Sequence, residues 1–362
     1  MVETEDESVL EYGFSFPSAF NSGVPENDVV PVHVILPKNA TGPVPAVIVL
    51  HFWGAVDQKI ERSLAGDLTS KGIAAILITL PYHLQRTPKG LRSGEAAIPA
   101  DTAGMIRTMT QAVLDVRRTV DFIVSRPEFD ASRIGIAGTS LGSIVSSLSF
   151  ALEPRIKSAS FMLGGADLAH ILWNSSRIVK VRETLRKKGI LEAHLREALR
   201  EVEPLTYLGD RTTGGSFVIG GKFDTVIPPE DTKKLIASLP DPQTLWLETG
   251  HYGGIFVQRR VLRLVSQFFA GQFGGQAFTP PKSIFAPTLR IMIEANMESS
   301  FQVGIGLDIW KANARGDVFS TLIATPRGPQ LFLGAKLDRG LAIGAFATLK
   351  RVSPGVIWSF VL

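Results

Sequence analysis

A glycine-flanked serine stands near the middle of the chain, in the stretch Gly138-Thr139-Ser140-Leu141-Gly142. An apolar run precedes it, Arg133 to Ala137, and a helix-compatible run follows it, Ser143 to Leu152. Glycines around a serine let the backbone turn sharply from a strand into a helix, so that the hydroxyl is lifted clear of the sheet. Such five-residue matches also occur in surface turns, but this context favours Ser140 as a catalytic nucleophile.

A serine hydroxyl attacks well only when a base takes its proton and an acid orients that base. The best-placed histidine is His251, because it lies in a glycine-rich loop after the last expected strand of an α/β pattern. Asp224 follows another expected strand and would lie at its carboxyl end. The order Ser140, Asp224, His251 is nucleophile, acid and base, and it predicts a catalytic triad. The alternative acids are Asp167 and Glu248.

An acyl-transfer site also needs two backbone N–H groups where negative charge develops on the substrate oxygen. Leu141, directly after the serine, supplies one of them. The loop His51-Phe52-Trp53-Gly54 follows an aliphatic strand, and we expect the second N–H from Trp53, with Phe52 as the alternative. The side chain of Phe52 would also line the acyl pocket. The end of a further strand on the same edge holds more candidates for substrate contact, each of which could equally be structural: Tyr82, His83 and Arg86.

These residues require a sheet whose loops meet at one edge. Short aliphatic runs such as Ala46–Leu50 alternate with helix-compatible segments such as Asp101–Ser125. This alternation predicts a doubly wound, mainly parallel α/β sheet over residues 1–275. Residues 168–210 interrupt it with short amphipathic helices, which we interpret as a helical cap insertion over the carboxyl edge; a surface decoration is the alternative.

From about Ser283 the apolar residues alternate with a period of two, which predicts six antiparallel strands in a meander. Turn signals such as Arg315-Gly316-Asp317 separate the strands. The result is a C-terminal all-β domain over residues 283–362, reached through a Gly- and Pro-rich linker. Apolar residues on both faces of Leu341–Leu362 indicate packing against the α/β domain or another copy, that is, a homo-oligomer. Six strands are fewer than the eight of a single-chain outer-membrane barrel, so we expect no membrane partner.

Composition narrows the class of protein. With 362 residues, 45% of them apolar, the chain is long enough for one large domain and a smaller one. It has no cysteine, which excludes disulfides and cysteine metal sites. The net charge of +4 comes from scattered Lys and Arg, so we expect no nucleic-acid partner. Met1–Ser8 is acidic and no apolar segment follows, so we expect no signal peptide, which favours a cytoplasmic location.

Taken together, these motifs resemble the α/β-hydrolase superfamily, particularly its carboxylesterase and dienelactone-hydrolase-like branches. The resemblance covers roughly Val29 to Gly271. It rests on four stretches: Leu50–Gly54, Arg133–Gly142, Gly221–Asp224 and Gly250–Tyr252. It implies a serine hydrolase that cleaves a small-molecule carboxylic ester through an acyl-enzyme intermediate, with no cofactor and no metal.

The chain departs from that pattern in two places. The oxyanion loop has Phe52-Trp53 where many relatives have glycine, which indicates a tighter acyl side. The C-terminal β region matches no branch of the superfamily that we can identify. A serine at the elbow, instead of cysteine or aspartate, argues against a strict dienelactone hydrolase and a haloalkane dehalogenase. The alternative function is a non-enzymatic assembly or surface-binding protein that keeps a hydrolase scaffold and acts through the C-terminal β domain.

Overall fold

The computed structural model describes residues 2–5, 9–296, 299–311, 318–338 and 340–361. The turn expected at 315–317 lies outside these residues. The chain forms two compact units, which we call the sheet unit and the barrel unit. The sheet unit comprises Met1–Ile219, Glu230–Leu245 and Arg259–Pro280; the barrel unit comprises Gly220–Pro229, Trp246–Gln258 and Pro281–Leu362.

A ten-stranded sheet has the strand order β1-β2-β3-β5-β4-β6-β7-β8-β9-β10. Its bounds are β1 Val2–Glu5, β2 Val9–Pro17, β3 Val29–Pro37, β4 Val44–Leu50, β5 Ala74–Ile78, β6 Phe129–Thr139, β7 Ile156–Met162, β8 Gly215–Gly221, β9 Gln243–Glu248 and β10 Ser283–Phe285. The first three strands pair antiparallel, whereas β5, β4, β6, β7 and β8 pair parallel. The predicted doubly wound, mainly parallel sheet is therefore confirmed. The short strands β1 and β10 were not predicted.

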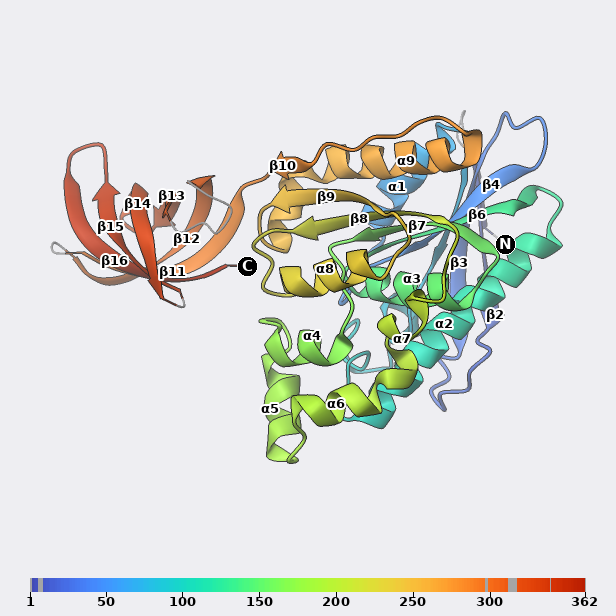
Figure 1. The fold of residues 1–362 in the computed structure, drawn as a ribbon, viewed down its shortest axis with the longest axis horizontal. Helices are drawn as coiled ribbons and strands as arrows, with labels where there is room; N and C mark the ends of the chain where they lie inside the picture. Colours follow the sequence, from blue (N-terminus) through green and yellow to red (C-terminus); the bar gives the residue numbers. More distant parts are fainter. Residues whose placement is uncertain (1, 6–8, 297–298, 312–317, 339, 362) are drawn as a thin grey trace. The chain divides into compact units, whose positions relative to one another are not determined.

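Helices cover both faces of this sheet (Figure 1). They are α1 Lys59–Thr69, α2 Thr102–Ser125, α3 Leu141–Leu152, α8 Pro229–Ala237 and α9 Gln258–Gly274. The long helix α2 begins where the Asp101 carboxylate accepts a hydrogen bond from the Gly104 N–H at 2.6 Å, a typical N-cap. Its apolar stripe, from Met105 to Ile123, is buried as the spacing predicts. Among the described residues, none of the helices combines the length and apolar character needed to cross a bilayer.

The interruption between β7 and β8 is helical, as predicted. It consists of α4 Leu168–Asn174, α5 Val179–Lys187, α6 Glu192–Ala198, the 3-10 turn η2 Arg200–Val202 and α7 Leu205–Leu208. The side chains of Leu185 and Leu195 are fully buried, although both helices also carry several charged residues. The insertion therefore packs as an ordered layer with its own apolar contacts.

A buried ion pair lies inside the sheet unit. Arg86, in the 3-10 turn η1 Leu84–Arg86, donates from Nη1 to Asp115 Oδ2 at 2.8 Å, and both side chains are inaccessible to solvent. The same guanidinium also donates to the carbonyl oxygens of Asn27 and Thr79. Removing one partner of such a pair leaves an uncompensated buried charge. These contacts give Arg86 a structural role.

Glu61, in the first turn of α1, is a buried carboxyl group with no hydrogen-bond partner for either oxygen among the described residues. Burial raises its pKa to about 7. The folded protein therefore holds a proton that the unfolded chain releases near pH 4.5, and stability falls as pH rises between these two values. Glu61→Gln should abolish this loss, which amounts to about 3 kcal/mol.

Urea unfolding of both proteins at about pH 4 and about pH 8 measures the effect. The wild type should lose free energy of unfolding between the lower and the upper pH, whereas Glu61→Gln should not. The difference between the variant and the wild type should therefore shift in favour of the variant at the upper pH. Glu183→Gln, at an exposed position of α5, is the matched control. An unchanged difference between the two pH values would show that the Glu61 carboxyl does not titrate in this range.

The C-terminal strands form a closed six-stranded barrel (Figure 1). They are β11 Thr288–Asn296, β12 Ser299–Lys311, β13 Val318–Thr325, β14 Gly328–Asp338, β15 Leu341–Ala347 and β16 Val352–Val361. All six predicted strands are present and antiparallel. Closure comes from β16, which pairs with both β15 and β11. Phe319, Phe332 and Phe346 pack together inside.

Candidate active site

Ser140 lies at the junction of β6 and α3, between Thr139 and Leu141. Its φ of 54° and ψ of −113° are strained for a residue with a side chain. The backbone is held there because the Ser140 N–H donates to the carbonyl oxygen of Met162, on the neighbouring strand β7, at 2.8 Å. This is the sharp strand-to-helix turn that the sequence predicts.

The two glycines around Ser140 are required by close backbone contacts. A Cβ at position 138 would lie 2.1 Å from the carbonyl oxygen of Gly142. A Cβ at position 142 would lie 2.5 Å from the carbonyl oxygen of Leu50, at the end of β4. Any larger residue would force the turn apart, so the glycine spacing follows from the fold. The second contact also brings the turn beside the loop that follows β4.

Leu141 is the first residue of α3, so its backbone N–H belongs to the helix end that lacks intrahelical partners. The same end carries the partial positive charge of the helix dipole. Both features favour negative charge next to Ser140. The Leu141 N–H is therefore suited to receive an oxyanion formed at the serine.

The loop after β4 is fixed by His51, whose side chain is fully buried. Burial lowers its pKa to about 3, so the ring is neutral. Nε2 accepts a hydrogen bond from the Leu80 N–H at 3.0 Å, which puts the ring proton on Nδ1, and Nδ1 donates to the Phe52 carbonyl oxygen at 2.9 Å. Because a peptide unit is planar, holding the Phe52 C=O also sets the direction of the Trp53 N–H.

The side chain of Trp53 has two further contacts. Its indole Nε1–H donates to the carbonyl oxygen of Gly94 at 2.8 Å, and the guanidinium of Arg177 lies 5.3 Å from the indole ring centre. Gly94 has a φ of 80°, in the left-handed region that favours glycine. A Cβ there would meet Trp53 and the Gly54 N–H, so this close approach holds the loop in place.

The predicted substrate-contact residues differ in their accessibility. His83 is fully buried, with a ring centre 4.9 Å from that of His51 and with Nδ1 2.8 Å from the Pro81 carbonyl oxygen. Burial lowers the pKa of His83 to about 4. Tyr82 is partly exposed, and its N–H donates to Asn27 Oδ1 at 2.9 Å. Substrate contact by either residue stays a prediction.

The barrel unit contains a buried histidine–aspartate pair. His251 Nδ1 lies 2.6 Å from Asp224 Oδ2, and both side chains are almost inaccessible to solvent. The other carboxylate oxygen of Asp224 accepts hydrogen bonds from the N–H groups of Val226 and Ile227, each at 2.8 Å. Asp224 is thereby held as an acceptor, and it holds the proton of the imidazole on Nδ1. The ring nitrogen Nε2 is left as the basic atom.

The two alternative acids are engaged in other interactions. Asp167 caps α4 and pairs with Arg196 at 2.6 Å and with Lys234 at 2.7 Å. Glu248 pairs with Lys222 at 2.7 Å. Within the barrel unit, Asp224 is thus the carboxylate bonded to the His251 ring.

The loops that carry this pair contact the first part of the barrel. Thr249 donates from Oγ1 to the carbonyl oxygen of Pro287 at 2.8 Å, directly before β11. On β12, Lys311 places its ammonium 3.7 Å from the ring centre of Phe223, next to Asp224. Burial lowers the pKa of Lys311 to about 8. The barrel therefore supports both the loop that carries Asp224 and the loop that carries His251.

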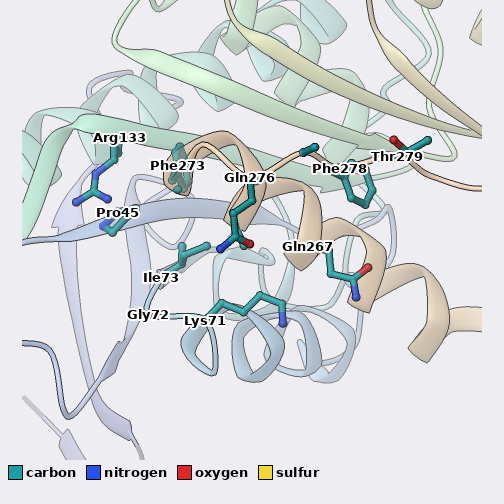
Figure 2. Close-up of a pocket in the computed structure, with 14 residues that line it drawn as sticks. Pro45, Lys71, Gly72, Ile73, Arg133, Gln267, Phe273, Gln276, Phe278 and Thr279 are labelled. Atoms are coloured by element: carbon teal, nitrogen blue, oxygen red, sulfur yellow. The ribbon is translucent and has the colours of Figure 1, made fainter.

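A cavity of about 670 Å³ lies elsewhere in the sheet unit (Figure 2). Figure 2 shows Gln276 and Gln267 beside it, together with Lys71 and Arg133. It lies at the amino ends of β4, β5 and β6, whereas Ser140 follows the carboxyl end of β6. None of the predicted site residues lines it. Across the described residues, no cluster of three or more His, Asp or Glu side chains could hold a metal ion.

Sequence reasoning missed the contacts that fix the loop after β4. His51 was named only as the first residue of that loop, and the contact of Arg177 with Trp53 joins residues more than one hundred positions apart. Lys311 was not singled out at all. The local sequence carries no signal for these contacts, because each depends on how distant segments pack.

Comparisons with known proteins agree with this architecture. A family model described as "Alpha/beta hydrolase domain containing 18" matches residues 1–164. An uncharacterized protein of Mycobacterium tuberculosis strain H37Rv is 29% identical over 205 residues, which are 56% of this chain and 47% of that protein. The chain thus spans about half the length of the curated relatives it matches.

Several solved structures share the fold. Acetyl xylan esterase 1 from Thermoanaerobacterium has a TM-score of 0.59 at 18% identity, covering 75% of this chain and 86% of its own. An acetyl xylan esterase from Paenibacillus has a TM-score of 0.58 at 20% identity, covering 74% of this chain and 87% of its own. A 2,6-dihydroxy-pseudo-oxynicotine hydrolase has a TM-score of 0.51 at 16% identity, covering 75% and 71%. At these identities the likeness shows the fold.

Proposed function

We propose that this chain is a serine hydrolase of the α/β-hydrolase superfamily that cleaves carboxylic esters through an acyl-enzyme intermediate. The observation that carries the proposal is the strained Ser140 at the β6–α3 turn. Backbone strain of this kind persists where the surrounding structure enforces it, and here it presents a hydroxyl at the positive end of a helix. The buried His251–Asp224 pair supplies the base that such a serine needs.

The mechanism follows from these groups. His251 Nε2 takes the proton of the Ser140 hydroxyl while Oγ attacks the ester carbonyl carbon. The carbonyl oxygen becomes negative and accepts hydrogen bonds from the N–H groups of Leu141 and Trp53. His251 then gives its proton to the alcohol oxygen, and the C–O bond breaks. A water molecule repeats the sequence on the acyl-enzyme and releases the carboxylic acid.

The acyl side of the site is proposed to accept small groups. Phe52 and Trp53 are bulky, and the indole of Trp53 is tied to Gly94 instead of being free to move aside. Two of the similar structures are named acetyl xylan esterases, a name that refers to the cleavage of acetyl esters. A series of p-nitrophenyl esters with acyl chains of increasing length should therefore show the highest kcat/KM for the shortest chains.

A fluorophosphonate probe tests the proposed nucleophile directly. Such a probe phosphonylates a serine whose hydroxyl is activated, so the folded protein should be labelled, and peptide mass spectrometry should place the adduct on Ser140. Heat-unfolded protein is the control and should not react. Folded protein that stays unlabelled would contradict the proposal and favour the non-enzymatic alternative.

A further inference from the structure

We propose that one end of the barrel docks on a lipid surface that carries anionic headgroups. This end, here called the turn end, is formed by the β13–β14 turn with Arg327 and by the β15–β16 turn with Leu349 and Lys350. The linker from the sheet enters the barrel at the opposite end, where β11 begins at Thr288. The proposal does not rest on ester hydrolysis, because lipid binding is measured without catalysis.

The outer face of the barrel is apolar all the way around. Every strand directs at least one large apolar side chain outward, with exposed fractions between 43% and 80%: Ile291, Phe301, Leu322, Leu333, Ile343 and Trp358. A protein partner would cover one side of a closed barrel and leave the other sides in water. Because apolar residues are exposed on all six strands, a barrel end that enters a lipid surface can contact acyl chains on every side.

Polar groups lie inside the barrel instead. Asp308 is buried, and its carboxylate accepts hydrogen bonds from Arg290 Nε at 2.8 Å and from Thr321. Glu294 is also buried, and it accepts a hydrogen bond from Gln330 Nε2 at 3.0 Å. The barrel thus exposes large apolar side chains while these two carboxylates are buried beside the Phe319–Phe332–Phe346 cluster, and an outer face of this kind favours contact with lipid over contact with water.

The charges at the surface complement anionic headgroups. Four basic side chains are exposed on the described part of the barrel: Arg327, Lys336, Lys350 and Arg351. Three of the four lie at the turn end. Basic residues near an anionic lipid surface contribute about 1 kcal/mol each to binding.

The turn end combines this charge with apolar side chains. Leu349 is fully exposed beside Lys350, and Val352 is mostly exposed at the start of β16. Phe301 and Val303, near the start of β12, extend the apolar surface from this end along the barrel wall. Leu and Phe side chains can enter the acyl region while Lys and Arg stay at headgroup level.

This inference differs from the expectation drawn from strand number. A six-stranded barrel is smaller than single-chain barrels that span a membrane, but docking at a surface requires no span. A second copy of the chain is a weaker candidate for the turn end, because two basic surfaces would face each other.

Sedimentation of the full chain with vesicles tests the proposal. One set of vesicles contains phosphatidylcholine alone and the other also contains about one third phosphatidylglycerol. The protein should sediment with the second set, and added salt should reduce binding. The double variant Arg327→Gln with Lys350→Gln should bind about 25-fold more weakly, or about fivefold for each charge. Leu349→Ser should weaken binding as well, and the fold should persist because the Leu349 side chain is fully exposed.

A matched control is Lys187→Gln with Lys188→Gln, which removes the same charge from exposed positions at the end of α5. It should bind like the wild type. Equal weakening in both double variants would overturn the proposal, because net charge alone would then explain binding. Protein that sediments with neither set of vesicles would also overturn the proposal. So would a dimer, detected by light scattering, that the Leu349→Ser substitution dissociates.

Discussion

Replacing Ser140 by alanine should reduce kcat for p-nitrophenyl ester hydrolysis by about a millionfold, the loss seen when the nucleophile of a serine triad is removed. The oxyanion N–H groups would remain, so a small residual rate over water is expected. The fold should persist, because alanine meets the same strain at this φ as serine does and fills no new space.

The matched control is Ser149→Ala, on the same helix. Ser149 is buried in α3, and its hydroxyl has no hydrogen-bond partner among the described residues. Turnover should therefore be unchanged, as should the circular dichroism spectra of both variants. Unchanged turnover in Ser140→Ala would exclude Ser140 as the nucleophile.

Asp224→Asn should lower kcat by about ten thousandfold with little change in structure. The asparagine Oδ1 can keep the hydrogen bonds from the Val226 and Ile227 N–H groups, which turns its NH2 group toward His251 Nδ1. That nitrogen must then be the acceptor, so the ring proton moves to Nε2. An imidazole with a proton on Nε2 cannot take the serine proton.

The chain contains a second histidine–aspartate pair that serves as the control. Asp231 Oδ2 lies 2.8 Å from His170 Nδ1, in the sheet unit. Asp231→Asn changes the same kind of contact but should leave kcat within a few-fold of the wild type. Equal losses in the two variants would indicate general destabilisation instead of a wrong tautomer at His251.

Local patterns predicted the elements that are long or strongly periodic. The apolar spacing of α2 fits one helix face, and the alternation in β11–β16 fits one side of each strand. Each pattern can therefore bury its apolar residues in only one arrangement. The glycine spacing around Ser140 was equally informative, because only glycine fits where the backbones of Leu50 and Gly142 approach.

The sequence was less informative where stability comes from distant partners. The strand β10 has three residues and is defined by its pairing with β9 across the linker. Barrel closure likewise depends on β11 meeting β16, which no local turn signal encodes. For the same reason, neighbouring residues did not predict that the buried Glu61 carboxyl lacks a hydrogen-bond partner among the described residues. Nor did they predict the hydrogen bond from His51 to the Phe52 carbonyl oxygen.

The contacts of Thr249 with Pro287 and of Phe223 with Lys311 bear on how this chain can be dissected. A chain shortened at the linker would lose the carbonyl acceptor of Thr249 and the ammonium beside Phe223, and with them the packing around the His251–Asp224 pair. The boundary drawn from the change of hydrophobic period is therefore a poor place to cut. Swapping the barrel for that of another protein would require these two contacts to be rebuilt in the recipient.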